Sequence, residues 1–142
     1  MKQIKQLLIL LAIMIGLTAC ATDAQKKENM PKDGVEVLYF HGKQRCATCQ
    51  AIEKETKALI DSQFADAVKS GKVRFRVVDI TKTENEALAD KYEITWSSLV
   101  LVKYNNGNEN AENLTQFAFA NARSNPSLFK KELATKIHQM LK

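Results

Sequence analysis

The sequence predicts a single α/β domain, a three-layer sandwich in which helices cover both faces of a central mixed four-stranded sheet. Three features indicate this class: a strand–helix–strand pattern, a later strand followed by a tight turn, and an amphipathic C-terminal helix. Of the 142 residues, 45% are hydrophobic and 26% charged, as is usual for a globular protein. Once an N-terminal targeting segment is set aside, the length leaves room for one such domain.

The first half of the domain has the strand–helix–strand pattern. Residues 35–40 are β-branched, aliphatic or aromatic apart from one glutamate, which is typical of a buried strand. Residues 46–69 carry apolar side chains at helical spacing and predict a long helix, broken near Asp61. Gly71 can cap this helix, and residues 73–80 then predict a central strand. This order favours parallel pairing of the two strands.

A second strand–helix unit follows. Residues 83–92 predict a helix, with Thr83 as its N-cap and Glu86 at the capping-box position. Residues 98–104 are again almost entirely apolar and predict another buried strand.

A hairpin and a helix complete the domain. The Asn-Asn-Gly-Asn sequence at 105–108 predicts a tight turn, after which residues 114–119 can return antiparallel. Pro126 suits the first turn of a helix that runs to Leu141. We expect its buried stripe to consist of Leu128, Phe129, Leu133, Ile137 and Leu141.

The N-terminus has the pattern of a secretory signal. Lys2 and Lys5 precede the apolar run 7–15, which is shorter than the roughly 20 residues that a membrane-spanning helix needs. The sequence Leu-Thr-Ala-Cys ending at Cys20 resembles the bacterial lipobox, whose cysteine is lipidated and becomes the mature N-terminus. We therefore expect a signal peptide at 1–19 and a membrane-anchored protein.

Between Cys20 and the domain lies a polar segment without apolar periodicity. Residues 20–33 predict a lipidated flexible tether, and residues 34–142 the folded domain. Without Lys2 and Lys5 the net charge falls from +5 to +3, and its dispersed distribution gives no reason to expect nucleic-acid binding. The domain is expected in the periplasm, attached to either the inner or the outer membrane.

Two of the three cysteines form a Cys-x-x-Cys motif. Cys46 and Cys49 follow the first predicted strand and begin the first helix. Unpaired N–H groups and the helix dipole stabilise a thiolate at such a position, and the spacing brings the second sulfur within reach of the first. We therefore predict Cys46 as the nucleophile of thiol–disulfide exchange and Cys49 as the resolving residue, with Cys46 the more exposed.

This element order, with the motif at the start of the helix, resembles the thioredoxin-like proteins. The tract 39–53, together with Trp96-Ser97-Ser98-Leu99, is similar to a small bacterial family labelled nitrophenyl compound nitroreductase subunits. The resemblance covers about residues 35–140. It implies a redox-active dithiol without cofactor, protein or small-molecule thiol partners, and an electron-relay protein. No residues resemble a flavin site or a nitroaromatic pocket.

Residues around the motif supply further candidates. His41 ends the first strand and can shuttle a proton, and Lys43 and Arg45 lie in the loop before Cys46. His138 is expected on the solvated face of the last helix.

Two positions depart from the thioredoxin pattern. Ser97 takes the place of the cis-proline that faces the cysteine pair, so we expect a trans peptide there and an altered substrate edge formed by Trp96, Ser97 and Ser98. The buried acid of the first strand is replaced by Tyr39 or Phe40.

Two other interpretations stay open at this point. Two thiolates with His41 as a third ligand could form part of a metal or iron–sulfur site, although the ligand set is incomplete. Alternatively, Cys46 and Cys49 form a permanent disulfide in a binding module. The direction of electron flow is likewise open, because it depends on the reduction potential.

Overall fold

The structure is a computed structural model that describes residues 32–142. The elements in chain order are β1 (Gly34–His41), α2 (Ala47–Gln63), α3 (Ala65–Lys69), β2 (Val73–Asp79), the 3₁₀ turn η1 (Thr83–Asn85), α4 (Glu86–Lys91), β3 (Ser98–Asn105), β4 (Asn108–Asn113), α5 (Thr115–Asn121) and α6 (Pro126–Met140). The predicted signal peptide and almost all of the predicted tether lie outside the described residues.

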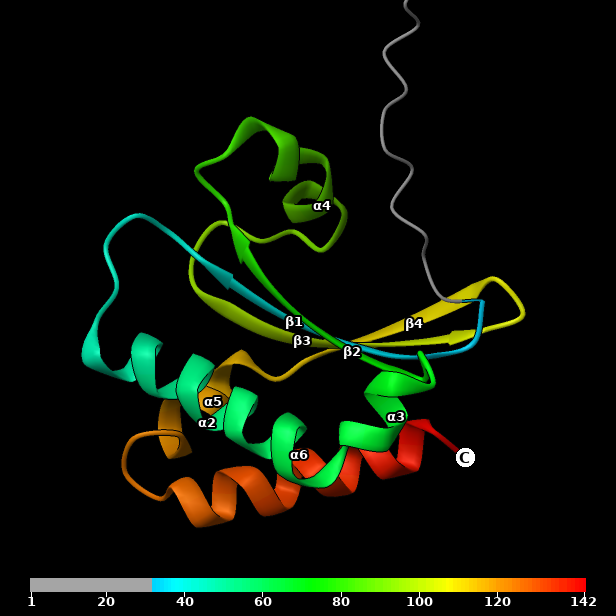
Figure 1. Cartoon of the computed structure of the whole chain (residues 1–142). Helices are drawn as coiled ribbons and strands as arrows, with labels where there is room; N and C mark the ends of the chain where they lie inside the picture. The colour runs from blue at the N-terminus through cyan, green and yellow to red at the C-terminus, as the bar shows by residue number, and fades with distance from the viewer. Residues whose placement is uncertain (1–31) are drawn as a thin grey trace, which may run out of the picture.

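A four-stranded sheet in the order β2-β1-β3-β4 forms the middle layer. Strand β1 pairs parallel with β2 and antiparallel with β3, and β3 pairs antiparallel with β4. Helices α2, α3, α5 and α6 lie on one face of the sheet and α4 on the other (Figure 1). The predicted three-layer α/β architecture with a mixed sheet is confirmed.

Alternating side chains of β1 belong to two cores, one on each face of the sheet. Val37 and Tyr39 point to the larger core beneath α2 and α6, which includes Leu59 and Leu133. Phe40 points to the smaller core beneath α4. This alternation decides which side chain of β1 reaches the cysteine pair, because α2 covers only one face.

Several local predictions are confirmed. The long helix after Cys46 is interrupted at Phe64, three residues beyond the expected break at Asp61. Gly71 ends the helical segment with φ +75°, and the hairpin turn has positive φ at Asn106 and Gly107. Helix α6 begins at Pro126, behind an Asn125 N-cap whose side chain accepts a hydrogen bond.

The returning strand of the hairpin was predicted wrongly. Strand β4 consists of the polar residues Asn108–Asn113, and residues 115–121, which overlap the predicted strand, form α5. The physical reason is helical spacing: Leu114, Ala118 and Ala122 recur every fourth residue and are all buried against the larger core. The polar strand is stable because it pairs with β3 at an exposed edge.

Three further predictions need correction. Strand β2 lies at the edge of the sheet rather than in its centre, and Val77 is 43% exposed there. Thr83 opens a 3₁₀ turn instead of capping a helix, because α4 begins only at Glu86 and neither start has a side-chain cap. Leu128 lies outside the buried stripe of α6, with 39% of its surface exposed.

Within residues 32–142, no helix is long and apolar enough to span a membrane.

Candidate active site

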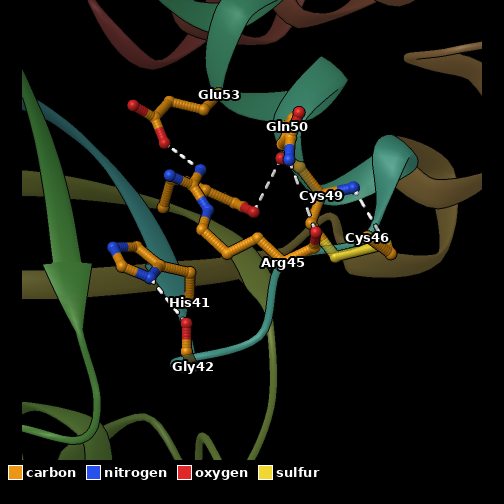
Figure 2. Close-up of a disulfide and its surroundings, with 8 residues drawn as sticks. His41, Gly42, Arg45, Cys46, Cys49, Gln50 and Glu53 are labelled. Carbon is orange, nitrogen blue, oxygen red and sulfur yellow. Dashed lines mark hydrogen bonds and ion pairs between the residues drawn. A yellow bond between two sulfur atoms is a disulfide. The ribbon is translucent and has the colours of Figure 1, made fainter.

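The cysteine pair lies where the chain passes from β1 into α2 (Figure 2). Cys46 is the N-cap of α2, and its Sγ accepts a hydrogen bond from the backbone N–H of Cys49 at 3.1 Å. The two side chains form a disulfide with Cα atoms 5.0 Å apart. Cys46 is exposed and Cys49 is 6% exposed, so the predicted difference in accessibility is present.

The start of α2 favours a negative charge on Cys46. The first N–H groups of a helix lack intrahelical acceptors, and the helix dipole is positive at this end. The first turn of α2 holds no acidic residue that would oppose this effect. In the reduced protein, the exposed Cys46 is therefore suited to attack a disulfide as a thiolate, while Cys49 remains shielded beside it.

Tyr39, rather than Phe40, reaches the cysteine pair from β1. Its hydroxyl is buried and donates a hydrogen bond of 2.7 Å to the carbonyl oxygen of Cys49. Burial raises the pKa of Tyr39, and the side chains of Arg45 and Ser97 act in the opposite direction. The phenol is consequently neutral at physiological pH.

Arg45, the residue before Cys46, forms an ion pair with Glu53 of α2. Its guanidinium lies over the ring of Tyr39, 5.6 Å from the ring centroid, and its carbonyl oxygen accepts a bond from Gln50. Burial lowers the pKa of Arg45, but Glu53 and Tyr39 outweigh this effect and raise it overall. The sequence indicates Arg45 only as a nearby cation and gives no sign of Glu53, because Arg45 precedes α2 and Glu53 lies in its second turn.

His41 contacts Tyr39 rather than the sulfurs. Its ring stacks on Tyr39 with centroids 6.1 Å apart, and its Nδ1 lies 2.9 Å from the carbonyl oxygen of Gly42. A carbonyl can only accept, so Nδ1 carries the proton and Nε2 is the basic nitrogen of the neutral ring. Figure 2 shows His41 set apart from the disulfide, beyond the Arg45 side chain. Lys43, in the same loop, is exposed.

The predicted substrate edge lies at the start of β3, whose first residue is Ser98. Ser98 pairs with Phe40 of β1, and Ser97 is 8% exposed. No cis peptide bond occurs in the described part of the chain, which agrees with the trans peptide expected before Ser97. Trp96 is 56% exposed and packs on Phe119 of α5, with ring centroids 5.2 Å apart. The sequence does not indicate this contact, because it predicts a strand where Phe119 lies in α5.

The remaining candidates lie apart from this site. His138 is exposed on α6 and packs against Phe64, at a centroid distance of 4.8 Å. Cys20 lies outside the described residues. Within residues 32–142, no group of three or more His, Cys, Asp or Glu side chains could hold a metal ion.

The chain is similar to several thioredoxins of known structure. The thioredoxin of Fasciola hepatica is 23% identical with a TM-score of 0.47, over 77% of this chain and 83% of that one. The thioredoxin of Malassezia sympodialis is 21% identical with a TM-score of 0.48, over 78% and 77%. The malaria parasite thioredoxin-2 is 26% identical with a TM-score of 0.44, over 72% and 86%. No model of a known family and no curated protein matches the chain.

Proposed function

We propose that this protein is a thiol–disulfide oxidoreductase whose reacting groups are Cys46 and Cys49. The observation that carries the proposal is the exposed Cys46 at the N-cap of α2, within bonding distance of the buried Cys49. A permanent structural disulfide gains little from this placement, because it closes a very short loop. A reactive pair gains both thiolate stabilisation and rapid resolution.

In the reducing direction, the Cys46 thiolate attacks one sulfur of a substrate disulfide. A mixed disulfide forms, and the first substrate sulfur leaves as a thiolate. Cys49 then loses its proton to water or a nearby base and attacks Sγ of Cys46. The second substrate thiolate leaves, the Cys46–Cys49 disulfide forms, and two electrons have passed to the substrate. An electron-relay protein with its own dithiol restores the reduced pair, and the oxidising direction is the reverse.

The proposal also includes the cellular localisation of the protein. Lipidation of Cys20 would attach the chain to a bacterial membrane, with residues 20–33 as a tether and the domain in the periplasm. The test is Cys20→Ala in the full chain. Release from the membrane fraction is the expected result, and unchanged membrane association would contradict the assignment. We assign no nitroreduction to this site, because no residues resemble a flavin site or a nitroaromatic pocket.

The decisive experiment is the reduction potential of the full chain, with metal content measured on the same sample. A reversible two-electron couple without stoichiometric metal is expected. Its value relative to about −270 mV for thioredoxin and about −120 mV for a strong periplasmic oxidant indicates the direction. Cys46→Ser should abolish exchange, whereas Cys49→Ser should accumulate mixed disulfides. A pair that never cycles, or full turnover in Cys46→Ser, would disprove the proposal.

A further inference from the structure

The Arg45–Glu53 ion pair joins the two ends of the dithiol turn. Arg45 directly precedes Cys46, and Glu53 lies one helical turn after Cys49. The pair is partly buried, with side-chain exposures of 26% and 30%. Figure 2 shows the Arg45 side chain directed toward Glu53 and away from the disulfide.

The packing around Arg45 holds its guanidinium between Tyr39 and Glu53. The guanidinium lies over the Tyr39 ring, and its Nε is buried without a hydrogen-bond partner in the described structure. Glu53 therefore supplies the hydrogen bond and the opposite charge that offset the burial of this cation. Without the Glu53 carboxylate, the positive charge on Arg45, the residue before Cys46, would no longer be neutralised.

An unneutralised cation on the residue that precedes Cys46 would change the stability of the Cys46 thiolate. A positive charge near a cysteine stabilises its thiolate, and a pair whose reduced form is stabilised is a stronger oxidant. A second ion pair of α2, Lys57–Asp61, lies farther along the helix with exposures of 64% and 62%. Solvent screens a pair of that kind much more effectively.

We propose that Glu53 is a positioning residue that holds the Arg45 cation over Tyr39 and neutralises it, and that this pair thereby sets the reduction potential of Cys46–Cys49. This inference rests on the proposed function. It requires a reactive dithiol and identifies, within this chain, the two groups that tune it.

The test uses Glu53→Gln in the full chain, with Asp61→Asn as the matched control. Both substitutions remove one carboxylate of α2 and break one ion pair. In glutathione redox buffers, Glu53→Gln should shift the equilibrium about three- to tenfold toward the reduced protein, where tenfold corresponds to about 30 mV. Asp61→Asn should leave it within about twofold of the original chain, because its charge is exposed.

Arg45→Gln separates an electrostatic role from a structural one. Loss of the cation leaves the Glu53 carboxylate unopposed and should shift the equilibrium toward the oxidised protein, opposite to Glu53→Gln. In the double variant both charges are gone, so the equilibrium should return toward that of the original chain. A shift of the same sign in both single variants, or equal potentials for Glu53→Gln and Asp61→Asn, would overturn the inference. If the original chain does not cycle at all, the proposed function itself fails, which is a distinct result.

Discussion

Removal of the Tyr39 hydroxyl tests the contact between the sheet and the cysteine pair. In Tyr39→Phe the ring remains in the larger core, so no large cavity forms and the lost quantity is one buried hydrogen bond to the Cys49 carbonyl. A hydrogen bond of this type contributes about 0.5–1.5 kcal/mol net. The Cys49 carbonyl lies inside α2 and keeps its helical acceptor role, so the penalty for a stranded buried group does not apply. We therefore expect Tyr39→Phe to lower the free energy of unfolding by about 1 kcal/mol.

The same substitution should affect exchange through the position of Cys49. The bond ties the first turn of α2 to β1, and its loss allows that turn to move relative to Cys46. We therefore expect the resolving step to slow several-fold while the initial attack by Cys46 changes little. Tyr92→Phe is the matched control. Tyr92 is the C-cap residue of α4, and its hydroxyl lies 3.5 Å from that of Tyr104, a distance at which a hydrogen bond is weak.

Two measurements check this prediction. Urea unfolding of the oxidised protein gives the stability difference, and stopped-flow kinetics of mixed-disulfide formation and decay separate attack from resolution. Unchanged stability and resolution in Tyr39→Phe would show that the hydroxyl does not hold the turn. A decrease of more than about 3 kcal/mol in the free energy of unfolding would show that the hydroxyl stabilises more than this one hydrogen bond.

Three further outcomes are expected from the fold. Burial raises the pKa of Tyr104 to about 12 from an ordinary value of 10.0, so the folded state keeps a proton that the unfolded chain loses. The free energy of unfolding should therefore fall by up to about 3 kcal/mol as the pH rises from about 10 to 12, and Tyr104→Phe should reduce this fall in an alkaline unfolding series. Gly34→Ala should destabilise by more than about 1 kcal/mol in urea, because Gly34 has φ +135° and a Cβ there would lie 2.5 Å from the Lys72 carbonyl oxygen; an unaffected variant would show that β1 can shift at no cost. Phe129→Ala should cost about 3–5 kcal/mol and the neighbouring Leu128→Ala less than about 1 kcal/mol, and equal losses would contradict the assigned faces of α6.

The sequence predicts those features that depend on neighbouring residues. A run of buried side chains identifies β1, and the spacing of Cys46 and Cys49 places the dithiol at a helix start. The polar strand β4 carries no such pattern, because it exists only by pairing with β3. Leu114 and Phe119 are apolar in either conformation, and only the packing of α5 against the larger core decides between strand and helix.

The side chains around the dithiol are harder to predict from the sequence, because their positions also depend on tertiary contacts. Tyr39 and Phe40 are adjacent, and which of them faces α2 depends on the pleat of a strand whose partners must be known. Arg45 precedes α2 and Glu53 lies within it, so neither helical nor strand periodicity relates the two residues. The surroundings that tune a reactive group are tertiary, whereas its position at a helix start is local.

The neutral phenol at Tyr39 has a consequence for the proton of Cys49. A buried carboxylate could accept that proton during resolution, but a phenol with a raised pKa cannot act as a base at neutral pH. His41 has an unprotonated Nε2, but the Arg45 side chain lies between its ring and the sulfurs. Solvent entering beside the exposed Cys46 is then the most direct acceptor. In this site Tyr39 positions the first turn of α2, and the Arg45–Glu53 pair sets the charge near the dithiol. Positioning and charge, which a single buried acid can provide together, are thus provided by separate groups.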